Sequence, residues 1–177
     1  MQAIGIRTAG ALLATSLLAT GAATAQTAGM SAADRFAERE AVELVLDRYV
    51  RALDLLEPEA YADVFAPEGE IVIYGEDVHR GRAELIDYLQ GVKENQEAAE
   101  ARGELQQFFH VHYNARITIA DADTAYHYAY WTTTARMPDE SIEDLAVGTL
   151  KDEFVKRDGQ WFLLRRELFH DPQPVEP

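Results

Sequence analysis

The stretch FFHVHYNARITI (residues 108–119) has the pattern of one long β-strand. Apolar and polar side chains alternate along it, and aromatic and β-branched residues are frequent, as in a half-buried strand. Similar stretches follow at residues 124–136, 145–157 and 160–170. The Asp158-Gly159 pair between the last two is typical of a tight β-hairpin. The second half of the chain is therefore predicted to be a meander of four antiparallel strands.

The first half of the chain has helical periodicity. Apolar residues recur at helical spacing within residues 32–55, which predicts one long amphipathic helix: Val42, Val45, Leu46, Tyr49, Val50 and Leu53. Pro58 suits the first turn of a short helix that we expect to end at Phe65. A short strand is expected at residues 70–75, and a third helix at residues 83–92 that frays into the polar tract 93–103. Helices before a four-strand meander indicate an α+β fold.

The N-terminus has the pattern of a signal peptide. Arg7 precedes an apolar run, and Ala23-Thr24-Ala25 has the small-x-small form of a cleavage site. The run is shorter than the roughly 20 residues that a membrane-spanning helix needs. We therefore expect residues 1–25 to be cleaved after Ala25, with no membrane insertion of the processed protein, which would be periplasmic or secreted.

Composition limits the remaining possibilities. The 177 residues are 47% hydrophobic and 27% charged, which is typical of one soluble globular domain. A net charge of −15 opposes binding to phosphate backbones, so nucleic acid is excluded as an expected partner. The chain has no cysteine and therefore no disulfide. We expect a flexible segment at 26–33, one domain at 34–171 and a tail at 172–177.

Alternation along residues 108–119 leaves two interpretations open. The even positions carry a polar set, Phe108, His110, His112, Asn114 and Arg116. The odd positions carry an apolar set, Phe109, Val111, Tyr113, Ile117 and Ile119. Either the odd face is buried and the histidines face solvent, or the even face lines a pocket.

The order of these elements resembles the SnoaL-like branch of the nuclear transport factor 2-like (NTF2-like) superfamily, a branch that is similar to scytalone dehydratase and the lindane dehydrochlorinase. The segments ALDLLEPEAYADVFAPEGEIVIYG (52–75) and KDEFVKRDGQWFLLRR (151–166) carry the resemblance, which covers residues 34–171. It implies a cone: a curved antiparallel sheet wrapped around the long N-terminal helix, with a pocket on the concave face. It also implies a homodimer or homotrimer that pairs through the convex face.

The resemblance also implies site residues. A catalytic aspartate ends the long helix, which matches Asp54, and a catalytic histidine stands four residues before an asparagine, which matches His110. A pocket tyrosine closes the short strand at Tyr74. Tyr49 stands where the dehydrochlorinase has a lysine, and either donates a hydrogen bond in the pocket or packs in the core. Further residues are expected to bind substrate: His112, Asn114, Tyr128 and Phe65.

These residues suggest a cofactor-independent lyase or isomerase that acts on a small hydrophobic molecule. A neutral imidazole is a base near neutral pH, and a carboxylate on its other nitrogen fixes the tautomer. His110 would abstract the proton and Asp54 would orient it, while Tyr49 and Tyr74 stabilise developing negative charge. No cofactor or metal is required. The alternative is a non-catalytic module that binds a small hydrophobic ligand, and the distance from Asp54 to His110 discriminates between the two.

The sequence also contains patterns of two other kinds of site. His110 and His112 form an H-x-H pair that could bind zinc, with His127 or His170 as a third ligand. Asp152 lies in an Asp-x-Phe context that resembles ketosteroid isomerases of the superfamily, but those enzymes need a carboxylate base in the region of the short strand where this chain has Ile73 and Tyr74. Asp152 is instead expected to pair with Arg165 or Arg166 across the hairpin.

Overall fold

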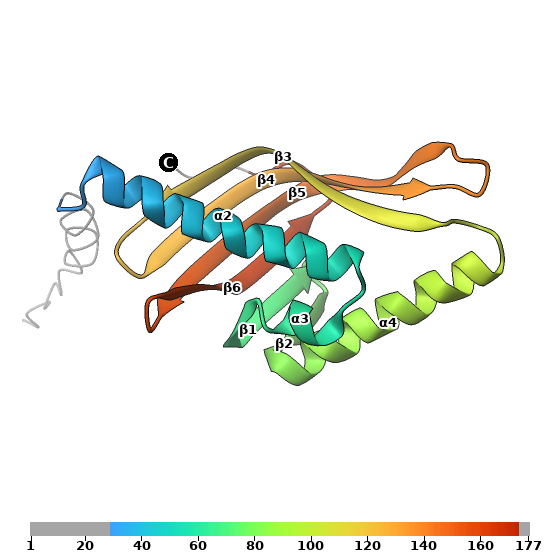
Figure 1. Cartoon of the computed structure of the whole chain (residues 1–177), viewed down its shortest axis with the longest axis horizontal. Coiled ribbons are helices and arrows are strands. Elements are labelled where there is room, and N and C mark those ends of the chain that lie inside the picture. Colours follow the sequence, from blue (N-terminus) through green and yellow to red (C-terminus); the bar gives the residue numbers. More distant parts are fainter. Residues whose placement is uncertain (1–28, 174–177) are drawn as a thin grey trace, which may run out of the picture.

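The computed structural model describes residues 29–173, so the predicted signal peptide lies outside the described residues. The elements, shown in Figure 1, are α2 (Ala32–Asp54), α3 (Pro58–Ala62), β1 (Phe65–Ile73), β2 (Asp77–Arg80), α4 (Gly81–Ala101), β3 (Gln107–Ile119), β4 (Thr124–Arg136), β5 (Ile142–Arg157) and β6 (Gln160–Phe169). The predicted α+β class, with a long N-terminal helix on a curved sheet, is confirmed.

The six strands form one sheet in the order β2-β1-β6-β5-β4-β3. The predicted meander β3 to β6 is antiparallel throughout, but β1 pairs with β6 in parallel. The expectation of a wholly antiparallel sheet is therefore corrected at this pair. Side-chain alternation reports which face a residue occupies and carries no information on strand direction, so the sequence pattern could not reveal it.

The helices differ from the predicted ones mainly at their ends. A capping box begins α2, in which Ser31 Oγ accepts from the Asp34 N–H at 3.1 Å. The predicted fraying after residue 92 is wrong, because α4 continues to Ala101 with Gln96 and Ala99 buried. The short helix ends at Ala62, so β1 begins earlier than expected. Within residues 29–173, no helix is both long and apolar enough to cross a membrane.

The core lies between α2 and one face of the sheet, which we call the concave face. Apolar side chains of α2, α3, β1, α4 and the meander are buried there together, among them Val42, Val45, Leu53, Tyr61, Ile71, Leu85, Ile117, Ile119, Phe154 and Leu163. Figure 1 shows α2 lying along the strands, with α3, β1, β2 and α4 gathered below its C-terminal half. The C-terminal end of α2 is thereby brought to the first half of β3.

A β-bulge in β3 decides which face its histidines occupy. The pairing with β4 shifts by one residue between Tyr113 and Arg116, and Asn114 has a φ of +51° there. One extra residue exchanges the two faces of the strand beyond it. His110 and His112 therefore share the concave face with Ile117, although the residue numbers differ in parity. Both interpretations of the alternation were incomplete, because the inward face is even before the bulge and odd after it.

Candidate active site

Asp54 and His110 form the dyad that the sequence predicts. Asp54 is the last residue of α2, and its Oδ1 lies 2.7 Å from His110 Nδ1. The His110 backbone N–H donates to the same oxygen at 3.1 Å. The Gln107 side chain donates to the Asp54 carbonyl oxygen at 3.0 Å. These contacts fix the start of β3 against the end of α2.

The dyad has the electrostatic arrangement of a general base. A carboxylate at a helix C-terminus lies at the negative end of the helix dipole, and the two donors from His110 offset that unfavourable position. An ionised carboxylate only accepts hydrogen bonds, so His110 Nδ1 carries the proton and Nε2 keeps a lone pair. Each side chain is 22% exposed, so the pair can be reached from solvent. His110 Nε2 can therefore accept a proton from a bound molecule.

His112 continues the concave face toward the interior. It pairs with Trp131 on β4, and its ring centroid lies 6.0 Å from that of His127. Burial lowers the pKa of His112 to about 3, and the positive charge of Arg166 acts in the same direction. His112 is therefore neutral at physiological pH.

A buried ionic triad lies beyond His112. Arg166 donates to both oxygens of Asp152, at 2.8 and 2.6 Å, and His127 Nδ1 lies 2.8 Å from Asp152 Oδ2. Burial by itself would raise the pKa of Asp152, but the charge and hydrogen bonds of Arg166 and the hydrogen bond from His127 hold this pKa well below its usual range. The predicted pairing of Asp152 is thus confirmed with Arg166, while Arg165 pairs with Glu70.

Tyr49 is buried in the core, where it contacts Arg166 of this triad. The Arg166 guanidinium lies 3.8 Å from the centre of the Tyr49 ring, in a cation–π arrangement. The Tyr49 hydroxyl is 3.3 Å from that of Tyr61, and Tyr49 is only 4% exposed. Of the two roles that the sequence leaves open for Tyr49, these contacts favour packing in the core.

Tyr74 stands on the turn between β1 and β2. Its φ is +56°, which is unusual for a bulky residue, and Gly75 follows at +75°. The Tyr74 ring stacks on His170 with centroids 3.6 Å apart and lies 6.5 Å from Trp131. Trp131 is an inward residue of β4 that pairs with His112, so Tyr74 reaches the concave face beside Trp131. It is 38% exposed, so its hydroxyl can meet a ligand.

The structure does not bring the other predicted binding residues to the dyad. Asn114 is exposed at the bulge, where β3 changes face. Tyr128 occupies an even position of β4, whereas the inward side chains of that strand, such as His127, occupy odd positions. Phe65 is buried against Tyr49 and Tyr61, as part of an aromatic cluster.

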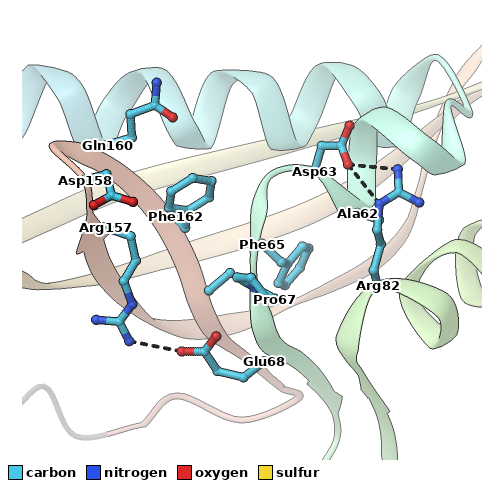
Figure 2. Close-up of a pocket in the computed structure, with 11 residues that line it drawn as sticks. Ala62, Asp63, Phe65, Pro67, Glu68, Arg82, Arg157, Asp158, Gln160 and Phe162 are labelled. Atoms are coloured by element: carbon cyan, nitrogen blue, oxygen red, sulfur yellow. Dashed lines mark hydrogen bonds and ion pairs between the residues drawn. The ribbon is translucent and has the colours of Figure 1, made fainter.

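Phe65 also lines a groove of about 690 Å³ that is separate from the dyad (Figure 2). The groove lies between β1, the start of α4 and the β5–β6 turn. Two exposed ion pairs flank its apolar floor, Asp63 with Arg82 at 2.9 Å and Glu68 with Arg157 at 3.0 Å. Within residues 29–173, no three His, Cys, Asp or Glu side chains are grouped to hold a metal ion.

Comparison with known proteins assigns the family. The model of the SnoaL-like domain family matches residues 34–167, so the chain belongs to this family. The predicted resemblance and the NTF2-like fold are therefore confirmed. A search of curated proteins found no match.

Solved structures of similar fold are numerous. An NTF2-like protein with a cystatin-like fold from Novosphingobium aromaticivorans is 23% identical, with a TM-score of 0.65, over 77% of this chain and 84% of that one. A provisionally assigned scytalone dehydratase from the same organism is 25% identical, with a TM-score of 0.60, over 76% and 84% of the two chains. LinA is 20% identical, with a TM-score of 0.63, over 78% and 89%.

Proposed function

We propose that this protein is a lyase or isomerase in which His110 abstracts a proton from a carbon atom of a small, largely apolar substrate. The observation that carries the proposal is the 2.7 Å contact between His110 Nδ1 and Asp54 Oδ1. It leaves Nε2 free as the base, and the Asp54 carboxylate would stabilise the imidazolium that forms. A non-catalytic ligand-binding module has no need of this pairing on a partly exposed histidine.

Elimination is the reaction type that the similar structures favour, since a provisionally assigned scytalone dehydratase and LinA are among them. In such a step the C–H bond breaks toward His110, its electron pair forms a C=C bond, and the leaving group departs with its own bonding pair. Tyr74 is exposed enough to donate a hydrogen bond to the leaving group or to an adjacent carbonyl oxygen. Leu53 precedes Asp54 on α2 and Trp131 pairs with His112 on β4, and these buried apolar neighbours of the dyad strand and helix suit a largely apolar substrate.

Deuterium exchange tests proton abstraction before the natural substrate is known. The protein would be incubated in D₂O with a panel of small cyclic ketones and β-hydroxy ketones, and deuterium uptake at carbon would be followed by mass spectrometry. We expect catalysed exchange for members of the panel, and a loss on the order of 10² to 10⁴ in rate for His110→Gln. A matched control is His79→Gln, on β2 at the opposite edge of the sheet.

Two outcomes would contradict the proposal. Equal exchange by His110→Gln and the parent would remove His110 as the base. Saturable binding of panel members with no exchange and no turnover would assign the protein as a ligand-binding module.

A further inference from the structure

One buried nitrogen of the triad is left without a partner. His127 is 2% exposed, and within the described residues its Nε2 makes no hydrogen bond, whereas its Nδ1 contacts Asp152. Buried polar atoms are nearly always paired, because an unpaired one has lost its hydrogen bonds to water. This nitrogen therefore requires a partner that the described chain does not supply.

The triad fixes which kind of partner Nε2 needs. Asp152 is held in its ionised form by Arg166 and can only accept, so the proton of His127 is on Nδ1. Arg166 already balances the charge of Asp152, and a second buried cation would be uncompensated. The neutral ring of His127 therefore presents a lone pair at Nε2, and its partner must be a hydrogen-bond donor.

His112 adds the complementary group. Its ring is neutral and therefore has one N–H and one lone pair. It lies 6.0 Å from the His127 ring between centroids, tilted by 44°. His112 is half-buried and therefore meets solvent beside the buried His127. The two rings together offer an acceptor from His127 and a donor from His112.

We infer that His112 and His127 bind a hydroxyl group of the substrate. A hydroxyl donates one hydrogen bond and accepts another, which matches this pair, whereas an ether oxygen or a carbonyl only accepts. His112 lies two residues from His110 on the same strand face, with Cα atoms roughly 7 Å apart. The substrate class is therefore a small, largely apolar molecule whose hydroxyl lies about as far from the acidic C–H as His112 lies from His110. The position of the hydroxyl relative to the C–H rests on the proposed function of His110, whereas the hydroxyl site itself does not.

Three small probes of nearly equal shape test the site. Phenol can donate and accept, anisole can only accept, and toluene can do neither. Each would be titrated into ¹⁵N-labelled protein, with the histidine ring nitrogens followed by long-range ¹H–¹⁵N NMR. We expect phenol to move the His127 Nε2 resonance toward the protonated position and to bind about 10-fold more tightly than anisole or toluene, the worth of one hydrogen bond.

Variants locate the effect. His127→Phe should bind all three probes equally, and His112→Phe should reduce the preference for phenol. His79→Phe is the control, on the strand at the far edge of the sheet, and should retain the full preference. If His127→Phe does not fold, His112→Phe and the histidine resonances of the parent protein still test whether the two histidines bind a hydroxyl.

Several outcomes would overturn the inference: equal binding of the three probes, no binding of any of them, or an Nε2 resonance that is already hydrogen-bonded before phenol and does not move, as with a permanent water. The result is independent of catalysis. Loss of exchange in His110→Gln with no preference for phenol would leave the proposed function intact and remove the hydroxyl site. A preference for phenol with unchanged exchange in His110→Gln would support the hydroxyl site and remove His110 as the base.

Discussion

One carboxylate oxygen of Asp54 contacts two atoms of His110, the ring Nδ1 at 2.7 Å and the backbone N–H at 3.1 Å. The ring contact sets the tautomer, and the backbone contact sets where the strand begins relative to the helix. The same side chain therefore supplies both electrostatics and position. The two contributions can be separated by substitution, because an amide keeps the shape of the carboxylate but not its charge.

Asp54→Asn should lower the catalysed exchange rate by about 10²-fold or more while the fold is retained. The amide oxygen can still accept from the ring, but it cannot stabilise an imidazolium, and its NH₂ group favours the wrong tautomer. The measurement is deuterium exchange beside far-UV circular dichroism. Asp63→Asn is the control, because Asp63 also stands at a helix C-terminus but pairs with Arg82 in the separate groove. An unimpaired Asp54→Asn would show that the carboxylate charge is dispensable.

His112 should make the folded state less stable in mild acid. The unfolded chain binds a proton at His112 below about pH 6.5, whereas burial keeps the folded pKa at about 3, so the unfolded state binds more protons between these values. The free energy of unfolding therefore falls as the pH drops from 6.5 toward 3. Urea denaturation at pH 7 and pH 4.5 should show a smaller difference for His112→Leu than for the parent protein. The exposed His170→Gln should behave as the parent, and identical pH dependence in all three would contradict the role of His112.

Arg166→Met should destabilise the fold by about 3–5 kcal/mol, because Asp152 would remain as a buried, uncompensated charge. The neighbouring Arg165→Met should cost less than about 1 kcal/mol, since Arg165 is partly exposed and its partner Glu70 keeps Arg80. Urea denaturation measures both. An equal decrease in the free energy of unfolding for the two variants would mean that the buried Arg166–Asp152 pair matters no more to stability than the partly exposed Arg165–Glu70 pair.

The sequence predicted the contact between Asp54 and His110 because both residues stand beside recognisable boundaries. Asp54 ends an amphipathic helix, and His110 belongs to the first long strand, so the family resemblance could be carried over without a register error. The sequence left the partner of Asp152 open between Arg165 and Arg166. The register set by the Asp158-Gly159 turn alone would place Asp152 opposite Arg165, and a bulge between Glu153 and Phe154 places it opposite Arg166 instead.

The exchange of faces along β3 could not be read from alternation. One residue at Asn114 reverses the inward face, so the polar even set and the apolar odd set each divide between two faces. Asparagine tolerates positive φ, and that is the one signal in the sequence for this bulge. The sequence indicates His127 only as a metal ligand, because its place beside Asp152 and Arg166 depends on pairings across three strands.

Export remains a proposal that rests on the sequence alone. Protein recovered from the periplasm of a Gram-negative host should have its N-terminus at or near Gln26, because the small-x-small site ends at Ala25. Intact-mass spectrometry of the recovered protein identifies its N-terminal residue. Recovery of exported protein that retains Met1 would contradict cleavage.

Assembly through the face of the sheet opposite α2 is the last proposal. Val111 and Tyr113 on β3 are each 41% exposed, and Tyr130 and Val147 on the neighbouring strands are also exposed. A second copy of the chain would bury these apolar side chains, and Tyr113→Asp would then place a charge in the interface without a partner. We expect this variant to elute later than the parent in size-exclusion chromatography with light scattering, as a smaller species. The matched control is Leu44→Asp, an exposed apolar position on α2. A Tyr113→Asp protein that is folded and elutes with the parent would exclude this face as the interface.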